Sequence, residues 1–428
     1  MAENSGQKLK ERYTLMIKDK KPVIVILVII LVLGLLAVYY TMPSGDASQV
    51  NATVSGNLGI SSNAPDEKED AEETVSGMDM TDITVSQNDE TVSENLVRRE
   101  KVRGIYVTGL MAGSANMDNL IALVDETCLN TMVIDIKDDQ GNITCQMDLS
   151  ANDIGADRNY VSDMEGLIEE LNEHHIYTIA RISCFKDPYL AGMRPELALK
   201  KKDGGFVTDT DDIPWVNPYE EAVWEYLTDI ALAAADMGFD EIQFDYVRFP
   251  VGKSAAAADY GVDVGVYSKE EAIVGFLSYA ADRLHEKNVV VGADVFGTVI
   301  DNKIDQEYTG QDYQLLGRTV DVLSPMIYPS HYRNGVYGLS VPDAYPYETI
   351  QYALEASVKE LEPVKEEERA IVRPWLQSFT ATWVPGHISY GGEEIKKQIQ
   401  AVYDAGYDEW ILWNAANRYP KEGVLQNI

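Results

Sequence analysis

The chain has 428 residues, of which 45% are hydrophobic, so it can form a sizeable core in one large domain or two ordinary ones. Its formal net charge is −35 at pH 7. Because a protein that binds nucleic acid needs basic surface to contact phosphates, this charge argues strongly against a nucleic-acid partner.

The N-terminal segment predicts a membrane anchor. Residues 1–21 form a basic tail, and residues 22–42 contain an uncharged run close to the ~20 residues that span a bilayer. The basic flank predicts that the N-terminus stays in the cytoplasm. A cleaved signal peptide is the alternative, but the run exceeds the usual ~7–15 residues and no small-residue cleavage site follows it. We therefore expect a single-pass protein of the cell membrane with an extracellular domain.

Residues 43–98 predict a disordered acidic linker. Up to about residue 95 they are mostly Ser, Thr, Asn, Gly, Asp and Glu, and Lys68 is the only basic residue. Few apolar residues and a high net charge cannot offset the entropy lost on ordering.

Cysteine usage adds little to this organisation. Cys128, Cys145 and Cys184 are too few for an extracellular disulfide framework. Cys128 lies on an apolar helix face and is expected in the core, whereas Cys145 and Cys184 follow consecutive strands and could pair.

Beyond the linker, strand-like and helix-like runs alternate up to the C-terminus. Eight strands within residues 99–428 predict a (β/α)8 TIM barrel. A doubly wound open sheet is the alternative, but it normally has a Gly-rich phosphate turn after its first strand, and residues 108–111 do not form one. The strands are expected at residues 102–108, 131–138, 177–184, 241–249, 289–296, 320–328, 371–379 and 409–414.

Start and stop signals mark the helices between these strands. Ser162 and Ser268 each precede a Glu by three residues, the spacing of a capping box. Asn217 before Pro218 predicts another helix start, and Gly238 predicts the left-handed residue that ends that helix. Further helices are expected at about residues 117–128, 345–361 and 393–405.

The alternation of side chains along the strands assigns polar residues to the barrel interior. Where one side of a strand is apolar and packs under the helices, the other side should face the barrel axis. Ionisable groups on four strands would be costly in an ordinary core, which favours a polar pocket at the C-terminal strand ends. A buried structural ion-pair network is the alternative. The expected inward residues are Asp135, Lys137, Arg181, Ser183, Gln243, Asp245, Gly292, Asp294, Met326, Tyr328, Trp375 and Gln377.

Asp245 and Asp294 are the candidate catalytic residues. They are carboxylates at equivalent depth on neighbouring strands, and cleavage of a glycosidic bond uses one ionised and one protonated carboxyl group. A strand spacing of about 4.8 Å predicts a carboxyl separation of about 5–6 Å, which suits a retaining mechanism. Asp245 is then the nucleophile, and Asp294, on an apolar strand that should raise its pKa, is the general acid/base.

Other side chains near the strand ends are expected to bind substrate. Asp135 and Lys137 could form a polar couple in which the lysine keeps the aspartate ionised. Arg248 could fold back over the rim to hold a carboxylate or a sugar hydroxyl, and His331 could bind substrate or carry a proton, although loop histidines more often do neither. Aromatic residues suit a saccharide groove but are also common in cores. The expected substrate-binding set is Asp135, Lys137, Arg181, Arg248, Tyr328, His331, Trp375, Gln377 and Trp413.

No motif predicts a cofactor. The chain shows no metal-ligand spacing, and residues 138–142 predict a turn rather than a calcium-binding loop. The chain has neither a Gly-x-Ser-x-Gly nor a phosphate-loop motif, which disfavours serine hydrolases and NTPases.

Five motifs in chain order resemble a known family. They lie at residues 102–108, 133–138, 244–250 (Phe-Asp-Tyr-Val-Arg-Phe-Pro), 326–332 (Met-Ile-Tyr-Pro-Ser-His-Tyr) and 373–377. They resemble the bacterial "putative glycosyl hydrolase" barrel family, which is classed with α-amylase-like and chitinase-like glycoside hydrolases. The resemblance covers about residues 100–420. In two respects the chain departs from these relatives: the position after Gln377, often acidic in the family, is Ser378, and the fourth strand lacks the acidic run of chitinases, so substrate-assisted chemistry is not implied.

These observations predict a membrane-anchored, extracytoplasmic glycoside hydrolase that acts on a cell-wall, capsular or environmental polysaccharide. The main alternative is a non-catalytic carbohydrate-binding or cell-wall-binding barrel. A lyase or a deacetylase is a weaker alternative, and a deacetylase would need a metal site.

Overall fold

The computed structural model describes residues 100–149 and 154–425. The expected anchor at residues 22–42 and the expected linker at residues 43–98 lie outside the described residues. Within the described part of the chain, no helix is long and apolar enough to cross a membrane.

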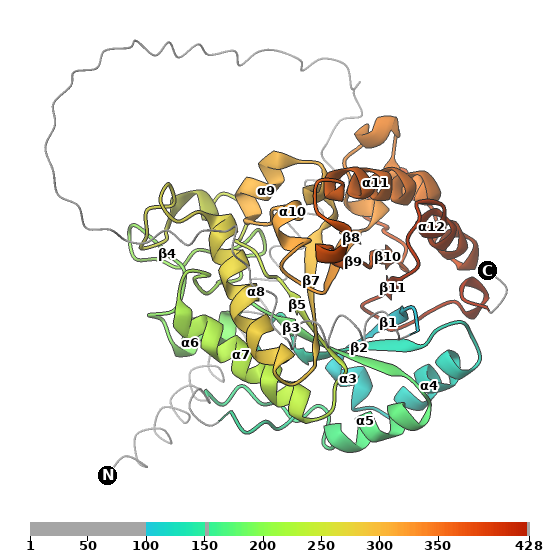
Figure 1. Ribbon diagram of the computed structural model, residues 1–428, viewed down its shortest axis with the longest axis horizontal. Helices are drawn as coiled ribbons and strands as arrows, with labels where there is room; N and C mark the ends of the chain where they lie inside the picture. The colour runs from blue at the N-terminus through green and yellow to red at the C-terminus, as the bar shows by residue number, and fades with distance from the viewer. Residues whose placement is uncertain (1–99, 150–153, 426–428) are drawn as a thin grey trace, which may run out of the picture. The chain divides into compact units, whose positions relative to one another are not determined.

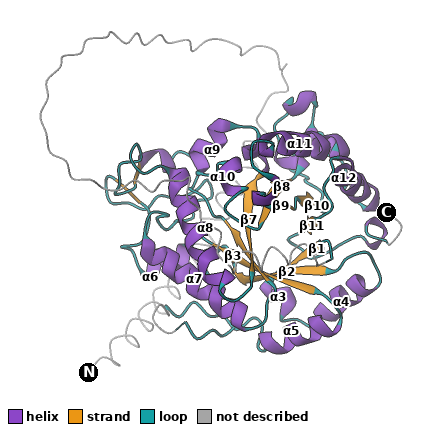
Figure 2. Ribbon diagram, viewed as in Figure 1, coloured by secondary structure: helices purple, strands orange, loops and turns teal. Residues whose placement is uncertain are grey.

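The strands form a closed parallel barrel. One sheet has the strand order β10–β11–β1–β2–β3–β5–β7–β8–β9, and an additional pairing of β10 with β8 closes the ring. The strands lie at the centre with the helices around them (Figure 1), as the colouring by secondary structure also shows (Figure 2). The predicted (β/α)8 barrel is therefore confirmed, and the open sheet is excluded. The strands of the barrel are β1 (Arg103–Val107), β2 (Thr131–Lys137), β3 (Tyr177–Ser183), β5 (Glu241–Asp245), β7 (Val290–Phe296), β8 (Val322–Ile327), β9 (Ile371–Val372), β10 (Trp375–Gln377) and β11 (Trp410–Trp413).

All eight expected strands are present, but two of them end or break earlier than predicted. The seventh is divided into β9 and β10 by Arg373 and Pro374, because proline has no N–H to donate to the ladder. The fourth, β5, ends at Asp245 because Tyr246 adopts a left-handed conformation with φ of 50°. A short antiparallel pair of strands, β4 (Lys200–Lys201) and β6 (Ala258–Asp259), lies outside the barrel sheet and was not predicted.

The helices follow the predicted segments, but their starts differ. Ser268 begins a complete capping box, as predicted. In contrast, Asp163 rather than Ser162 caps its helix, and Asn217 does not cap α7 because its side-chain oxygen accepts a hydrogen bond within the preceding turn. Gly238 has a φ of 102°, as expected of a left-handed residue after a helix. The helices are α3 (Gly109–Ala112), α4 (Met117–Asp125), α5 (Met164–Glu173), α6 (Pro188–Met193), α7 (Glu221–Asp236), α8 (Lys269–His285), α9 (Lys303–Thr309), α10 (Tyr313–Leu316), α11 (Pro346–Leu361) and α12 (Gly392–Asp404).

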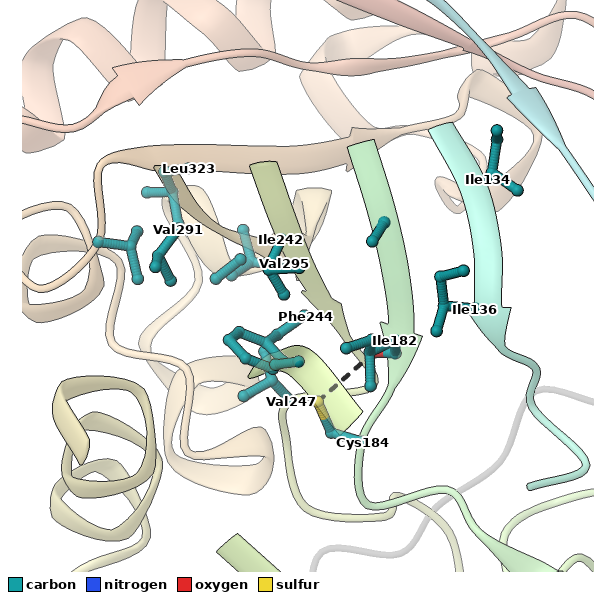
Figure 3. Close-up of a cluster of buried hydrophobic side chains, with 14 of the residues drawn as sticks. Ile134, Ile136, Ile182, Cys184, Ile242, Phe244, Val247, Val291, Val295 and Leu323 are labelled. Carbon is teal, nitrogen blue, oxygen red and sulfur yellow. Dashed lines mark hydrogen bonds between the residues drawn. The ribbon is translucent and has the colours of Figure 1, made fainter. Parts of the chain in front are cut away.

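An apolar layer packs between the strands and the helices. Ile134 and Ile136 of β2, Ile242 and Phe244 of β5, and Val295 of β7 are fully buried in one cluster. Figure 3 shows side chains of this layer, drawn from β2, β3, β5, β7 and β8. Since alternate residues of a strand face opposite sides, this packing turns the intervening polar residues towards the barrel axis.

The three cysteines are free thiols. Burial raises the pKa of Cys145 to about 12 and holds that of Cys184 well above its ordinary value. The Sγ atom of Cys184 lies 3.5 Å from the carbonyl oxygen of Ile182 inside the apolar layer (Figure 3), so the disulfide considered between Cys145 and Cys184 is not formed.

Candidate active site

A cluster of charged side chains lies at the C-terminal ends of β2, β3 and β5. The Arg181 guanidinium contacts Asp135 through Nη1 and Oδ1 at 2.5 Å. It also contacts Oδ2 of Asp245 through Nη2 at 2.5 Å and through Nε at 3.0 Å. All three side chains are buried. One guanidinium therefore joins two carboxylates from the strands on either side of β3 through charge-assisted hydrogen bonds.

A strained turn fixes the second oxygen of Asp245. The backbone N–H of Tyr246 donates to Oδ1 of Asp245 at 2.5 Å. A left-handed conformation in an aromatic residue costs on the order of 1–3 kcal/mol and persists only where the surroundings enforce it. Here the Tyr246 ring packs against Trp215, with the ring centroids 6.0 Å apart. Both oxygens of Asp245 are thus held in place.

Asp294 is the second carboxyl group of this region and is almost fully buried. Its Oδ1 atom accepts hydrogen bonds from Nε2 of Gln243 at 2.5 Å and from Nε1 of Trp375 at 2.7 Å. Its Oδ2 atom is buried without a hydrogen-bond partner among the described residues. Burial, and then the negative charge of Asp245, hold the pKa of Asp294 well above its ordinary value. The ladder pairs Phe244 with Ala293, so that the next residues of the two strands, Asp245 and Asp294, follow at the same level.

Aromatic rings cover the charged cluster on one side. Tyr106 and Trp413 stack with centroids 4.0 Å apart, and the Arg181 guanidinium lies 5.5 and 5.4 Å from their rings. The Tyr106 hydroxyl donates to Oδ2 of Asp135 at 2.5 Å. Burial raises the pKa of Asp135 to about 6, although Arg181 opposes the shift. Trp413 also packs edge-on against Trp375 at 5.7 Å, so both predicted tryptophans join the cluster.

Lys137 lies outside this cluster. Its Nζ atom donates to the carbonyl oxygen of Ser183 at 2.5 Å and pairs with Oδ2 of Asp187 at 2.9 Å. The register between β2 and β3 shifts between Asp135 and Lys137, so the two residues no longer follow one alternation. The couple expected between Asp135 and Lys137 is therefore wrong, and Arg181 is the cation that pairs with Asp135.

Tyr328 directly follows β8 and is buried in one cluster with Tyr106 and Trp375. Burial, and then the charges of Asp294 and Asp245, hold the pKa of Tyr328 well above its ordinary value. The Tyr328 ring packs edge-on against His331 at 5.3 Å and against Phe379 at 6.0 Å. His331 is exposed, with Nδ1 3.0 Å from the hydroxyl of the preceding serine.

Gln377 is fully buried and is held by protein groups. Its Nε2 atom donates to Oδ1 of Asp343 at 2.9 Å, and its Oε1 atom accepts from the backbone N–H of Ser330 at 3.0 Å. These bonds join the end of β10 to the segment that follows β8. The next residue, Ser378, is also buried.

A second buried ion network, which sequence reasoning missed, lies at the opposite end of the barrel. Arg373 contacts Glu241 through Nη1 and Oε1 at 2.7 Å and Glu409 through Nε and Oε2 at 2.9 Å, and all three are buried. Glu241 lies an even number of residues from Asp245, and Arg373 lies an even number from Trp375. The alternation that assigned Asp245 and Trp375 to the barrel interior could therefore have assigned Glu241 and Arg373 to it as well. The ion-pair network weighed from the sequence concerned the active-site end instead, where Arg181 pairs with Asp135 and Asp245.

The residues of this site do not form a metal cluster in the described part of the chain. Across residues 100–149 and 154–425, no group of three or more His, Cys, Asp or Glu side chains could hold a metal ion. A cavity of about 430 Å³ lies elsewhere, near α5 and α7, and contains none of the predicted site residues.

Comparison with known proteins places the barrel in a family. A model of the family described as "Putative glycosyl hydrolase domain" matches residues 104–419. The chain belongs to this family. By family, it is therefore a glycosidase, as the resemblance of its motifs implied. None of the curated proteins matches the chain.

Several solved structures are similar to this glycosyl hydrolase domain, and one of them, with a TM-score above 0.5, shares its fold. The glycoside hydrolase domain of PgaB (BpsB) from Bordetella bronchiseptica is 13% identical, with a TM-score of 0.56, over 77% of this chain and 100% of that chain. A hypothetical protein from Ruminiclostridium thermocellum is 37% identical over 45% of this chain and 97% of that chain, with a TM-score of 0.41. An α-galactosidase from Thermus thermophilus is 14% identical over 78% of this chain and 64% of that chain, with a TM-score of 0.45.

Proposed function

We propose that the protein is a membrane-anchored, extracytoplasmic glycosidase that cleaves a polysaccharide with Asp245 and Asp294. The observation that carries this proposal is the different environment of the two carboxyl groups. Asp245 is ion-paired with Arg181, whereas burial and the neighbouring charge raise the pKa of Asp294. One ionised and one protonated carboxyl group at adjacent strand ends are what glycosidic bond cleavage requires.

In the proposed mechanism, the configuration of the sugar is retained. A carboxylate oxygen of Asp245 attacks the anomeric carbon while Asp294 donates its proton to the departing glycosidic oxygen. Asp294, now ionised, then takes a proton from the water that hydrolyses the glycosyl–Asp245 ester, and both groups return to their first state. The equal level of Asp245 and Asp294 on neighbouring strands supports the short separation that a retaining enzyme uses.

The proposed location rests on residues 1–42. A basic tail before an uncharged run close to bilayer length supports an anchor with its N-terminus in the cytoplasm. The barrel would then meet cell-wall, capsular or environmental polysaccharide outside the cell. Mild proteolysis of intact cells should release a folded fragment that begins near residue 96. Recovery of that fragment only after lysis would overturn the orientation.

A non-catalytic carbohydrate-binding barrel is the second candidate. The fact that both oxygens of Asp245 already accept hydrogen bonds, with only 5% of the residue exposed, favours this function. A nucleophile must release one of these bonds to attack, whereas a binding module need not.

A reducing-sugar screen of the full-length chain on wall and capsule glycans separates the two candidates. Asp245→Asn should lower turnover by at least about 10³-fold and keep glycan binding, whereas the matched change Asp263→Asn, at an exposed loop position, should alter neither. Binding without turnover in the wild type would favour the binding module. NMR of the first-formed anomer tests the mechanism, because an inverted product is incompatible with Asp245 as nucleophile.

A further inference from the structure

Arg248 is a buried cation that has no ion pair in the described part of the chain. Only 6% of its surface is exposed. Its Nη1 atom donates to the carbonyl oxygen of Phe249 at 2.9 Å, while its Nε atom is buried without a hydrogen-bond partner. The buried cations Lys137, Arg181 and Arg373 each contact a buried carboxylate instead. Because burial of an unpaired charge is costly, a buried guanidinium whose Nε atom lacks a hydrogen-bond partner suggests that a ligand supplies one.

Three aromatic rings orient this guanidinium beside the candidate catalytic residues. Its central carbon lies 4.2 Å from the ring of Phe296, 4.7 Å from that of Trp215 and 5.4 Å from that of Tyr246. Tyr246 directly follows Asp245, and Phe296 is the last residue of β7, which carries Asp294. Cation–π contacts stabilise the position of the charge but do not neutralise it.

The guanidinium stays charged under physiological conditions. Burial lowers the pKa of Arg248 to about 10, a shift that the charges of Tyr246, Asp245 and Asp209 oppose. The group is therefore a cation at neutral pH, and its Nε edge has the planar geometry that binds a carboxylate through two parallel hydrogen bonds.

We propose that Arg248 binds a carboxylate of an acidic sugar in the substrate, in the subsite next to Asp245. This inference rests on the proposed glycosidase function and specifies its substrate class. A carboxylate would give Nε the partner it lacks, and the partly buried rings of Tyr246 and Phe296 suit the apolar face of a sugar. The net charge of −35 does not oppose this selectivity, because exposed charges are screened beyond about 10 Å whereas Arg248 acts in direct contact.

Paired glycans that differ only in the carboxyl group test the proposal with the full-length chain purified in detergent. One arm uses hexuronate oligomers, and the other uses peptide-free wall glycan with lactyl carboxylates, each beside its carboxyl-reduced form. The wild type should prefer the carboxylated form in kcat/KM, and the arm that shows the preference identifies the source of the carboxylate. Arg248→Gln should lower this preference by about 10- to 100-fold, and Arg248→Lys, which keeps the charge but not the planar fork, should lower it less. Arg333→Gln, at an exposed arginine of the loop after β8, should leave it unchanged.

If Arg248→Gln loses the same activity on the carboxylated glycan and on its carboxyl-reduced form, Arg248 has a structural role and the proposal is overturned. The proposal is also overturned if the wild type shows no preference for the carboxylated form. Cleavage of neutral glycans that depends on Asp245 but shows no such preference would leave the proposed function intact. If no glycan is cleaved, the proposed function fails, and calorimetric binding of the same oligomers still tests Arg248. Loss of binding preference in Arg248→Gln would then support the inference, and equal affinities for both forms would overturn it.

Discussion

Replacing Asp294 with Asn should stabilise the protein at pH 7 while removing most of its activity. The folded-state pKa of Asp294 lies well above 3.8 because burial and Asp245 disfavour the ionised form. The protonated carboxyl therefore stabilises the fold fully below pH 3.8, and this contribution is lost as the pH rises towards the folded-state pKa. Between pH 3.8 and pH 7 the loss is at most on the order of 4 kcal/mol. Asn avoids this loss because it is neutral and keeps an oxygen for Gln243 and Trp375.

Urea unfolding at pH 4, 5.5 and 7, followed by tryptophan fluorescence, measures this effect. The free energy of unfolding of Asp294→Asn should exceed that of the wild type by up to about 4 kcal/mol at pH 7, and the difference should vanish near pH 4. Activity should fall by about 10²- to 10⁴-fold, the usual contribution of a general acid. Asp245→Asn is the control and should destabilise the protein, because Arg181 loses an ionic partner. A variant that is less stable than the wild type at pH 7, with an unchanged pH slope, would show that Asp294 is ionised in the fold and refute the reasoning.

Further predictions concern residues around the site. Asp135, whose pKa is raised to about 6, should reduce stability by on the order of 3 kcal/mol as the pH rises from 3.8 to 6, and Asp135→Asn should flatten this slope in urea unfolding; an unchanged slope would contradict it. Lys137→Met should lower the free energy of unfolding by about 3–5 kcal/mol by leaving Asp187 buried and unpaired, and adding Asp187→Asn should recover part of the loss; a fully stable single variant would argue against this cost. Trp383 is 64% exposed and stacks on Phe379 at 5.9 Å, so Trp383→Ala should raise KM for long oligosaccharides several-fold with little change in kcat or melting temperature, and an unchanged KM would exclude it from substrate contact.

The barrel and the direction of its polar side chains could be predicted because both depend on local alternation. Ile242 and Phe244 face the helices, which turns Gln243 and Asp245 inward whatever the rest of the chain does. Lys137 could not be placed in this way, because the register shift after Asp135 interrupts the alternation and depends on how β2 pairs with β3. Helix starts were uncertain for a similar reason, since the Asn217 side chain bonds within a turn before α7.

The candidate carboxylates could be named from the sequence, but their environments could not. The pairing of Asp245 with Arg181 requires two strands in register, and the aromatic surround of Arg248 is assembled from Trp215, Tyr246 and Phe296 on separate segments. Such contacts follow from tertiary packing, which a one-dimensional pattern does not contain.

The network of Arg373 with Glu241 and Glu409 joins separate strands at the end of the barrel opposite the site. Glu241 begins β5, and Asp245 stands four residues further along the same strand, about 13 Å above it. Arg373 lies two residues before Trp375, whose indole holds Asp294. The network thus links β5, which carries Asp245, to the start of β10, whose Trp375 donates a hydrogen bond to Asp294. Sliding of β5 relative to β10 would move Asp245 relative to the Trp375 indole that holds Asp294, so salt bridges at one end of the barrel help to fix the relative position of the two acids at the other.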